Sequence, residues 1–341
     1  MTTERKLATV RLIDNIVPIK DADNIECAVV GGWNVVIKKG EYSIGDLAIY
    51  FEIDSWMPQH LAPFLFEGKV FEGVEGARLR TKKLRGVISQ GLLLPLSIAY
   101  HLPATTSVDI VGTDLTEALG IKKWDKPLSP QLQGVARGNF PYFIPKTDQE
   151  RVQNLTKELV NYQNEEFEVT IKLDGSSITI YSINLEDGEW QDGVCSRNLD
   201  LEESESAFWI ITKQENIHNK IRSTGRQLAF QGEMLNTNIQ GNREKVDKLC
   251  MFIYDVYDID AKRYLLPEER QELCSTLDIP HVPLHNNSYS LSDSVEELIL
   301  MADGDGMNKG VKREGLVYKH KHSDFSFKTI SNTYLLKNKD A

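Results

Sequence analysis

The sequence predicts an α+β protein with two domains, the first built from short strands and the second from strands and helices. Its 341 residues suffice for two domains with hydrophobic cores. Between Leu7 and Leu96, short apolar runs alternate with turn residues, whereas helical and strand patterns are mixed after Pro145. A stretch rich in Pro, Gly and scattered charge separates these regions.

The overall composition is that of an ordinary globular protein, with 41% hydrophobic, 26% charged and 9% aromatic residues. The first residues lack the apolar core of a signal peptide, and no run long enough to span a membrane occurs. The four cysteines are far apart and form no CxxC pair, which favours neither a zinc site nor a disulfide framework. We therefore expect a cytoplasmic protein without a membrane partner.

The net charge argues against a nucleic-acid partner at first sight. The chain has 39 basic and 50 acidic residues, a net charge of −11. Residues 1–120 are also slightly acidic, with 12 basic and 15 acidic side chains. Any contact with nucleic acid would therefore have to rest on a local basic face.

The N-terminal region is predicted to form a small antiparallel barrel or sandwich. Its expected strands lie within 7–19, 25–37, 46–53 and 87–96. Turn signals at Gly31, Gly32, Gly40 and Pro58 separate several of them.

One segment of this region carries a concentrated positive charge and is the candidate surface for a nucleic-acid backbone. Its basic residues are Arg78, Arg80, Lys82, Lys83 and Arg85. Arg78, Arg80 and Lys82 occupy alternate positions, so on a single strand they would form a basic stripe able to follow a phosphate backbone.

The second region is predicted to begin with a helix. Thr147 to Glu150 match the S/T-x-x-E capping box, and Val152, Leu155 and Leu159 follow at helical spacing. Further strands are expected at 167–182, 228–235, 250–257, 314–319 and 324–330, with helices near 265–276 and 292–302.

The segment FEVTIKLDGSSITIY alternates apolar and polar residues as a strand does, and its polar face carries candidate functional residues. Lys172 and Asp174 share one face, and Gly175 lets a ligand approach the backbone. Alone, this pattern is more often a half-exposed strand followed by a turn. The downstream strands, however, carry matching polar groups: Glu233, Glu314 and Lys328.

The ordered blocks KLDG, GE, MFIYDVYD, EG and FK, from Lys172 to Lys328, resemble the covalent nucleotidyltransferase superfamily of polynucleotide ligases and mRNA capping enzymes. The segments VVIKKGEYSIGDLAIYFEIDSWMP and LRTKKLRGVISQGLLLPL resemble the OB module that precedes the ligase domain in RNA ligase family 5. The resemblance implies an OB-like β-barrel RNA-binding module at 1–120, a linker at 121–145, and an ATP-grasp-like adenylyltransferase domain on antiparallel sheets at 146–341.

The same resemblance makes Lys172 the nucleophile that forms a lysyl-AMP intermediate. A free lysine is almost fully protonated at pH 7, so it needs burial, a cation or a metal to lower its pKa. Asp174, Glu233 and Glu314 are the expected carboxylates around Mg²⁺ or Mn²⁺, directly or through its waters. Glu233 could instead bind the ribose.

The resemblance also implies a wider nucleotide-binding set, in which Lys328 contacts the α-phosphate as a second catalytic residue. The set comprises Arg151, Asp174, Gly175, Arg197, Glu233, Phe252, Tyr254, Glu314 and Lys328. Either Phe252 or Tyr254 would stack on adenine. Ser326 occupies the position of a second family lysine, whose role Lys319 or Lys321 could take over.

The leading functional prediction is an ATP-dependent RNA ligase that adenylylates a 5′-phosphate end and joins it to a 3′-OH end. The expected partners are ATP, a divalent metal, and RNA as a nicked duplex or paired ends, bound by a monomer. The alternatives are an mRNA capping guanylyltransferase, disfavoured by the domain order, and a nucleic-acid-binding protein with an inactive transferase domain.

Overall fold

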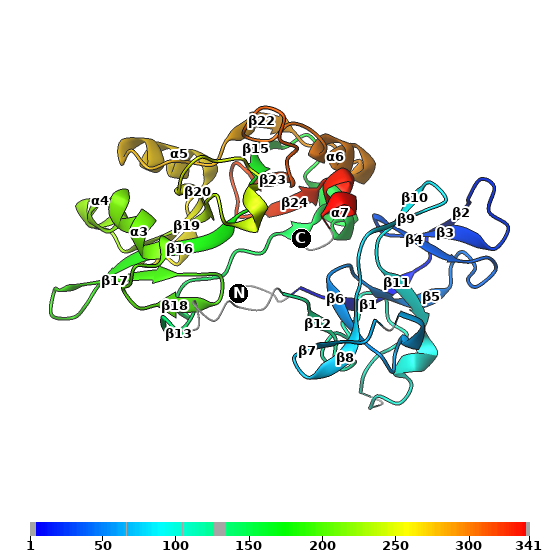
Figure 1. Cartoon of the computed structure of the whole chain (residues 1–341). Coiled ribbons are helices and arrows are strands. Elements are labelled where there is room, and N and C mark those ends of the chain that lie inside the picture. Colours follow the sequence, from blue (N-terminus) through cyan, green and yellow to red (C-terminus); the bar gives the residue numbers. More distant parts are fainter. Residues whose placement is uncertain (1–4, 66, 104, 126–133, 339–341) are drawn as a thin grey trace. The chain divides into compact units, whose positions relative to one another are not determined.

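The computed structural model describes residues 5–65, 67–103, 105–125 and 134–338. The chain forms two compact units, each drawn in Figure 1 and described by itself below. The N-terminal unit comprises residues 3–127, 152–160 and 332–341, and the C-terminal unit comprises 1–2, 128–151 and 161–331. Within the predicted linker, residues 126–133 lie outside the described part.

The N-terminal unit consists of small antiparallel sheets, as the sequence predicts, in the orders β1-β5-β11, β2-β3-β4, β12-β6-β8-β7 and β10-β9. Its strands are β1 (Ala8–Leu12), β2 (Asn15–Pro18), β3 (Ile25–Val30), β4 (Trp33–Lys38), β5 (Leu47–Phe51), β6 (Ser55–Pro58), β7 (Lys69–Phe71), β8 (Val74–Arg78), β9 (Lys82–Leu84), β10 (Val87–Ser89), β11 (Leu92–Pro95) and β12 (Lys122–Lys123). Its helical segments are η1 (Pro63–Leu65), η2 (Leu96–Ala99), η3 (Val152–Asn154), most of α2 (Thr156–Asn161) and α7 (Asn332–Lys337).

Strand β5 lies at the centre of the N-terminal unit because both of its faces are covered. Ile49 and Phe51 belong to one apolar cluster, whereas Ala48 and Tyr50 belong to another. Gly91 enters β11 with a φ of +104°, and a Cβ there would lie 2.4 Å from the Tyr50 ring. Only glycine therefore allows this turn to close against β5.

The C-terminal unit contains two sheets. The seven-stranded sheet has the order β13 (Ala136–Asn139), β18 (Leu199–Leu201), β17 (Trp190–Cys195), β16 (Ser176–Asn184), β19 (Leu228–Leu235), β20 (Cys250–Asp258) and β21 (Arg263–Tyr264). The five-stranded sheet has the order β14 (Glu150–Arg151), β24 (Ser326–Ile330), β23 (Gly315–His320), β15 (Glu166–Lys172) and β22 (Leu284–Ser290). The remaining elements are α3 (Ala207–Gln214), α4 (Ile217–Ser223), η4 (Gln240–Asn242), α5 (Pro267–Thr276) and α6 (Val295–Ala302).

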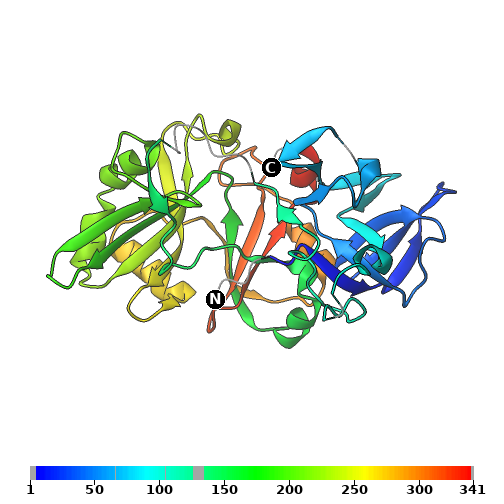
Figure 2. The ribbon, with the colours of Figure 1, turned by 90° about the horizontal axis from the view of Figure 1, so that it is seen from below.

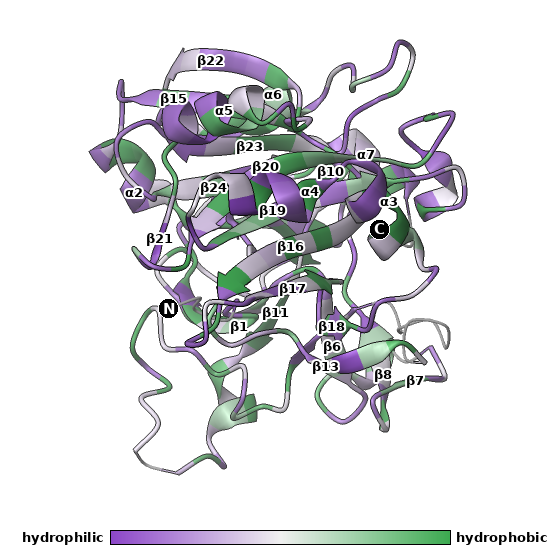
Figure 3. Cartoon of the chain, turned by 90° about the vertical axis from the view of Figure 1, so that its left-hand side faces the viewer, coloured by the Kyte–Doolittle hydropathy of each residue, from purple (hydrophilic) through white to green (hydrophobic). Residues whose placement is uncertain are grey.

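Helices α3 and α4 pack on the seven-stranded sheet (Figures 1 and 2). Phe208, Ile211 and Ile221 of these helices join Ile178 and Ile180 of β16 in one core cluster. At the edge of the other sheet, β22 is exposed along most of its length and is predominantly hydrophilic in Figure 3. None of the helices in the described ranges is long and apolar enough to cross a membrane.

The strands expected in this region are confirmed as β15, β16, β19, β20, β23 and β24, and the two later helices as α5 and α6. The helix predicted to begin at Thr147 is wrong. Glu150 and Arg151 instead form β14, which pairs in parallel with Phe327 and Lys328 of β24. The Glu150 carboxylate accepts the N–H of Arg151 at 2.8 Å, so long-range strand pairing overrides the local capping pattern and α2 begins only at Thr156.

Candidate active site

The candidate site lies in the C-terminal unit, where the five-stranded sheet continues into the seven-stranded sheet. Lys172 is the last residue of β15, and β16 begins at Ser176. Gly175, in the short connection, packs directly on β19: a Cβ there would lie 2.4 Å from the backbone oxygen of Met234. The KLDG block therefore has a structural basis, because its glycine brings the connection against the neighbouring strand.

The strands flanking this connection bring two carboxylates to Lys172. Strand β23 pairs with β15 so that Gly315 lies opposite Lys172, and the preceding Glu314 accepts a hydrogen bond from Lys172 Nζ at 2.8 Å. Strand β19 supplies Glu233, whose Oε1 accepts the N–H of Gly175 at 2.8 Å. Residues far apart in sequence thus converge around one lysine.

The electrostatics of the cluster favour a further cation. Burial lowers the pKa of Lys172, but the surrounding charges of Glu314, Glu233 and Asp174 outweigh it and leave the pKa above its ordinary value. Burial raises the pKa of Glu233 to about 8, with Lys172 opposing and Glu314 adding to the rise. Burial also raises the pKa of Glu314. One ammonium group therefore does not neutralise these carboxyl groups.

Two residues absent from the sequence prediction complete the cluster, Arg243 and Glu244. Arg243 Nη1 lies 2.5 Å from Asp174 Oδ2, and Glu244 Oε1 accepts the N–H of Asp174 at 3.1 Å. Glu244 is 3% exposed, and its Oε2 has no hydrogen-bond partner among the described residues. Burial raises the pKa of Glu244 to about 7. No pattern in the polar segment 240–248 distinguishes these residues in the sequence.

The cluster contains acceptor groups suited to a cation or to its waters. Within the described ranges, no three His, Cys, Asp or Glu side chains converge closely enough to hold an ion. Yet the raised pKa of Glu233 and the unpartnered Oε2 of Glu244 both indicate excess acceptor capacity. Mg²⁺ suits such a site because it retains several waters.

Two of the predicted cations, Lys328 and Arg197, lie close to Asp148, a residue that the sequence analysis does not assign to the site. Lys328 on β24 donates to Asp148 Oδ1 at 2.7 Å, and Arg197 Nη2 lies 3.8 Å from Asp148 Oδ2. Arg151 lies opposite Lys328 in the strand register and is buried. Strand pairing thus accounts for the proximity of Arg151 and Lys328.

The candidate base-stacking residues lie on one face of β20, as predicted from their spacing. Phe252 and Tyr254 are half-buried, whereas Met251 and Ile253 are buried. Phe252 lies opposite Glu233 in the strand register. The Tyr254 hydroxyl is within hydrogen-bond distance of the Thr147 hydroxyl, 3.2 Å, so Tyr254 is tied to the segment entering the domain.

Lys319 and Lys321, the two lysines that could replace the family lysine missing at Ser326, both lie close to carboxylates. Lys319 is buried and pairs with Asp255; burial lowers its pKa to about 8 although Asp255 opposes the shift. Lys321 lies 3.7 Å from Glu166 and 3.6 Å from Glu268. Lys319 is the one adjacent to β20, since it also donates to the backbone oxygen of Tyr254 at 2.5 Å.

The candidate RNA-binding residues of the N-terminal unit do not form the expected single-strand stripe. Arg78 ends β8, whereas Lys82 begins β9, and the intervening residues belong to neither strand. Arg78 is buried, pairs with Asp54 at 2.7 Å and stacks over Trp124 at 3.9 Å. Lys82, Lys83 and Arg85 are exposed.

A lysine among carboxylates, at the connection between two sheets, is the arrangement expected of a covalent nucleotidyltransferase. Comparison with known families agrees: an RNA ligase model matches residues 165–330, and an OB-fold domain model matches residues 7–96. The chain belongs to the RNA ligase family, because it shares 45% identity over nearly its whole length with solved RNA ligases.

Among the similar structures are those of an RNA ligase from Naegleria gruberi. The structure with pyrophosphate has 45% identity and a TM-score of 0.91, covering 99% of this chain and 100% of that one. A lysine-to-alanine mutant with ATP and Mn has 45% identity and a TM-score of 0.90, covering 98% and 100%. An apo mutant has 44% identity and a TM-score of 0.91, covering 99% and 100%. No curated protein matches the chain.

Proposed function

We propose that the chain is an ATP-dependent RNA ligase in which Lys172 forms a lysyl-AMP intermediate. The carrying observation is the position of Lys172, 2.8 Å from Glu314 and surrounded by the charges of Glu233 and Asp174. The ATP and Mn of the similar Naegleria structures support ATP and a divalent metal as its cofactors. Family membership favours this function over RNA capping and over an inactive transferase domain.

In the first step, neutral Lys172 Nζ attacks the α-phosphorus of ATP, a P–N bond forms, and pyrophosphate leaves. Asp174, Glu233 and Glu314 are the residues that would hold the metal, with Glu244 as an additional acceptor. When bound, the metal supplies positive charge that lowers the pKa of Lys172 and offsets charge on the phosphate. Lys328 binds the α-phosphate as a compact cation.

The remaining nucleotide contacts follow from the same arrangement. Either Phe252 or Tyr254 stacks on adenine, since both are half-buried on the same face of β20. Arg151 and Arg197 flank Lys328 and bind phosphate or ribose, and Gly175 keeps the backbone close to the nucleotide. Glu233 has a second possible partner in the ribose.

In the next steps, AMP is transferred to a 5′-phosphate RNA end, and a 3′-OH then attacks with release of AMP. The proposal assigns RNA binding to residues 1–120, a linking role to 121–145, and adenylyl transfer to 146–341. Arg80, Lys82, Lys83 and Arg85 are its RNA-contacting residues, whereas Arg78 supports them from within. A nicked-duplex substrate, a monomeric state and a cytoplasmic location belong to this proposal.

The test is covalent labelling of the purified chain with α-labelled ATP or GTP and Mg²⁺. We expect label from ATP that survives denaturation, none from GTP, and none in Lys172→Ala. Lys213→Ala, which removes a half-exposed lysine of α3 from the same unit, is the matched control and should label normally. Labelling of Lys172→Ala, or labelling by GTP alone, would contradict the proposal.

A further inference from the structure

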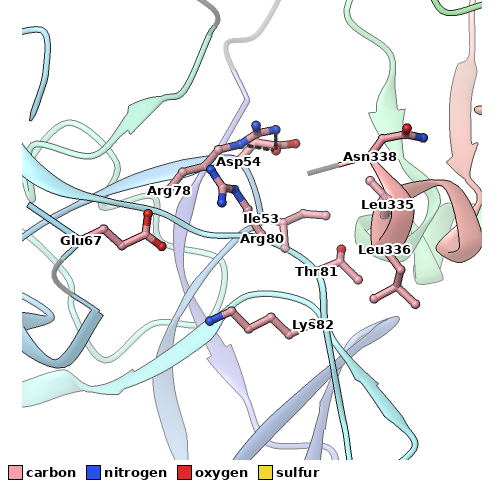
Figure 4. Close-up of a pocket in the computed structure, with 10 residues that line it drawn as sticks. All are labelled: Ile53, Asp54, Glu67, Arg78, Arg80, Thr81, Lys82, Leu335, Leu336 and Asn338. Carbon is pink, nitrogen blue, oxygen red and sulfur yellow. Dashed lines mark hydrogen bonds and ion pairs between the residues drawn. The ribbon is translucent and has the colours of Figure 1, made fainter. Parts of the chain in front are cut away.

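A cavity within the N-terminal unit is formed between its strands and the C-terminal helix α7. Its volume is about 300 Å³. Figure 4 shows Leu335, Leu336 and Asn338 on one side, facing the side that carries Arg80 and Lys82. The volume lies at the lower end of the range found for small-ligand sites.

The cavity wall contains two cations, Arg80 and Lys82, whose side chains form no hydrogen bond or close ion pair with the described residues. Arg78 is paired with Asp54 at 2.7 Å. Arg80 Nε, in contrast, is buried and has no hydrogen-bond partner in the described part of the chain. Glu67 also lines the cavity, and its carboxylate accepts a hydrogen bond from Lys69 at 3.0 Å. This bond lowers the pKa of Glu67, and the charges of Arg80 and Lys82 add to the shift, so one carboxylate faces three cations. A buried guanidinium nitrogen without a partner favours a bound anion.

The opposite wall is apolar with a polar edge. Leu335 and Leu336 are half-buried on α7, and Thr81 and Asn338 contribute a hydroxyl and an amide. Inorganic phosphate would use only the cations. A nucleotide would use all three features, because its phosphate is anionic, its base packs on apolar side chains and its polar edges form hydrogen bonds.

We infer that this cavity accepts one unpaired ribonucleotide of the RNA substrate, with the phosphate at Arg80 and Lys82 and the base against Leu335 and Leu336. The inference rests on the proposed RNA ligase function and deepens its RNA-binding part. A base-paired nucleotide does not fit this arrangement, because its faces are stacked and its edge is paired. The cavity therefore takes a nucleotide that lies outside the base-paired part of the substrate.

Fluorescence anisotropy with a labelled 12-nucleotide RNA single strand, and with a blunt RNA duplex of the same sequence, tests the inference. Arg80→Gln should weaken single-strand binding about tenfold and leave duplex binding within about twofold. The slope of log affinity against log salt should fall by about 0.7, the value for one lost phosphate contact. Lys39→Gln, which removes the same charge from an exposed site of this unit, should change neither.

Leu336→Trp fills the cavity without changing its charge. It should weaken single-strand binding with an unchanged salt slope. Equal losses on strand and duplex, or no loss with Arg80→Gln, would overturn the inference. Each protein preparation is also labelled with ATP, a reaction of Lys172 that needs no RNA. If the wild type labels normally but Arg80→Gln does not weaken single-strand binding selectively, the inference about the cavity is wrong and the proposed function stands. If the wild type does not label, the proposed function is wrong.

Discussion

The Lys172 ammonium nitrogen lies 2.8 Å from Oε2 of Glu314, so the proposed nucleophile is held as the cationic partner of a carboxylate. This contact orients Lys172 but opposes attack, because only the neutral amine is nucleophilic. Lys172 must therefore lose a proton and its ion pair with Glu314 before the chemical step.

The rate of adenylylation should rise with pH. The pKa of Lys172 lies above its ordinary value under the influence of its carboxylate neighbours, so its neutral fraction increases throughout the range from pH 6 to 9. Glu233, with a pKa of about 8, also becomes charged in this range and then binds a cation better. Single-turnover labelling at saturating Mg²⁺ should accelerate by up to about tenfold per pH unit. A flat or falling profile would show that another group controls the step.

Glu233→Gln should stabilise the metal-free protein while abolishing adenylylation. Burial raises the pKa of Glu233 from 4.5 to about 8, so the folded state loses stability as pH rises through this interval. The glutamine removes the buried charge and keeps an acceptor for the Gly175 N–H. Thermal melts above pH 8 should show a gain of about 1 kcal/mol, and at pH 4 the two proteins should melt alike. If Glu233→Gln is less stable than the wild type at high pH, the surrounding residues of the folded protein compensate the charge of Glu233, which would contradict the prediction.

Glu244 offers a test of the additional acceptor in the site. Glu244→Gln keeps an acceptor for the Asp174 N–H but removes the charge, so we expect labelling to require several-fold more Mg²⁺ with little change at saturation. Glu244→Ala also removes the acceptor and should cost about 1–3 kcal/mol of stability. Titrations of labelling against Mg²⁺, together with melting curves, separate the two effects. An unchanged Mg²⁺ requirement in Glu244→Gln would exclude Glu244 from metal binding.

Sequence periodicity locates the residues that regular strands carry. The sequence predicts strands that carry Lys172, Glu233, Phe252 and Lys328, and the structure has these residues on β15, β19, β20 and β24. Alternation along a strand fixes which side chains share a face. The family resemblance, through the order of its sequence blocks, identifies which strands carry the candidate site residues. Strand pairing then brings these side chains together.

The residues that sequence reasoning missed depend on tertiary packing. Glu244 and Arg243 lie in an irregular segment and meet Asp174 only because the chain folds back on the β15–β16 connection. Asp148 was considered only as part of a capping box, whereas it accepts a hydrogen bond from Lys328 at 2.7 Å. The burial of Arg78 followed from Asp54 and Trp124, neither of which is adjacent to it in sequence.

Gly175→Ala tests whether close packing of the connection on β19 maintains the site. A Cβ at this position would lie 2.4 Å from the Met234 backbone oxygen and 2.5 Å from Leu235 Cδ2, so the connection or β19 must shift. We expect a loss of about 2–3 kcal/mol of stability and a weakened Gly175 N–H bond to Glu233. Labelling should fall even at temperatures where the variant remains folded, because Asp174 moves with the connection.

Gly138→Ala is the matched control, since a Cβ at Gly138 in β13 meets no atom within 4 Å. The control should melt and label like the wild type. Near-UV circular dichroism separates a local shift from unfolding. If Gly175→Ala labels normally, the connection tolerates displacement, and the position of Asp174 would not depend on its contact with β19. Loss of labelling in a folded Gly175→Ala, with Gly138→Ala unaffected, would show that the backbone contact itself positions the reactive cluster.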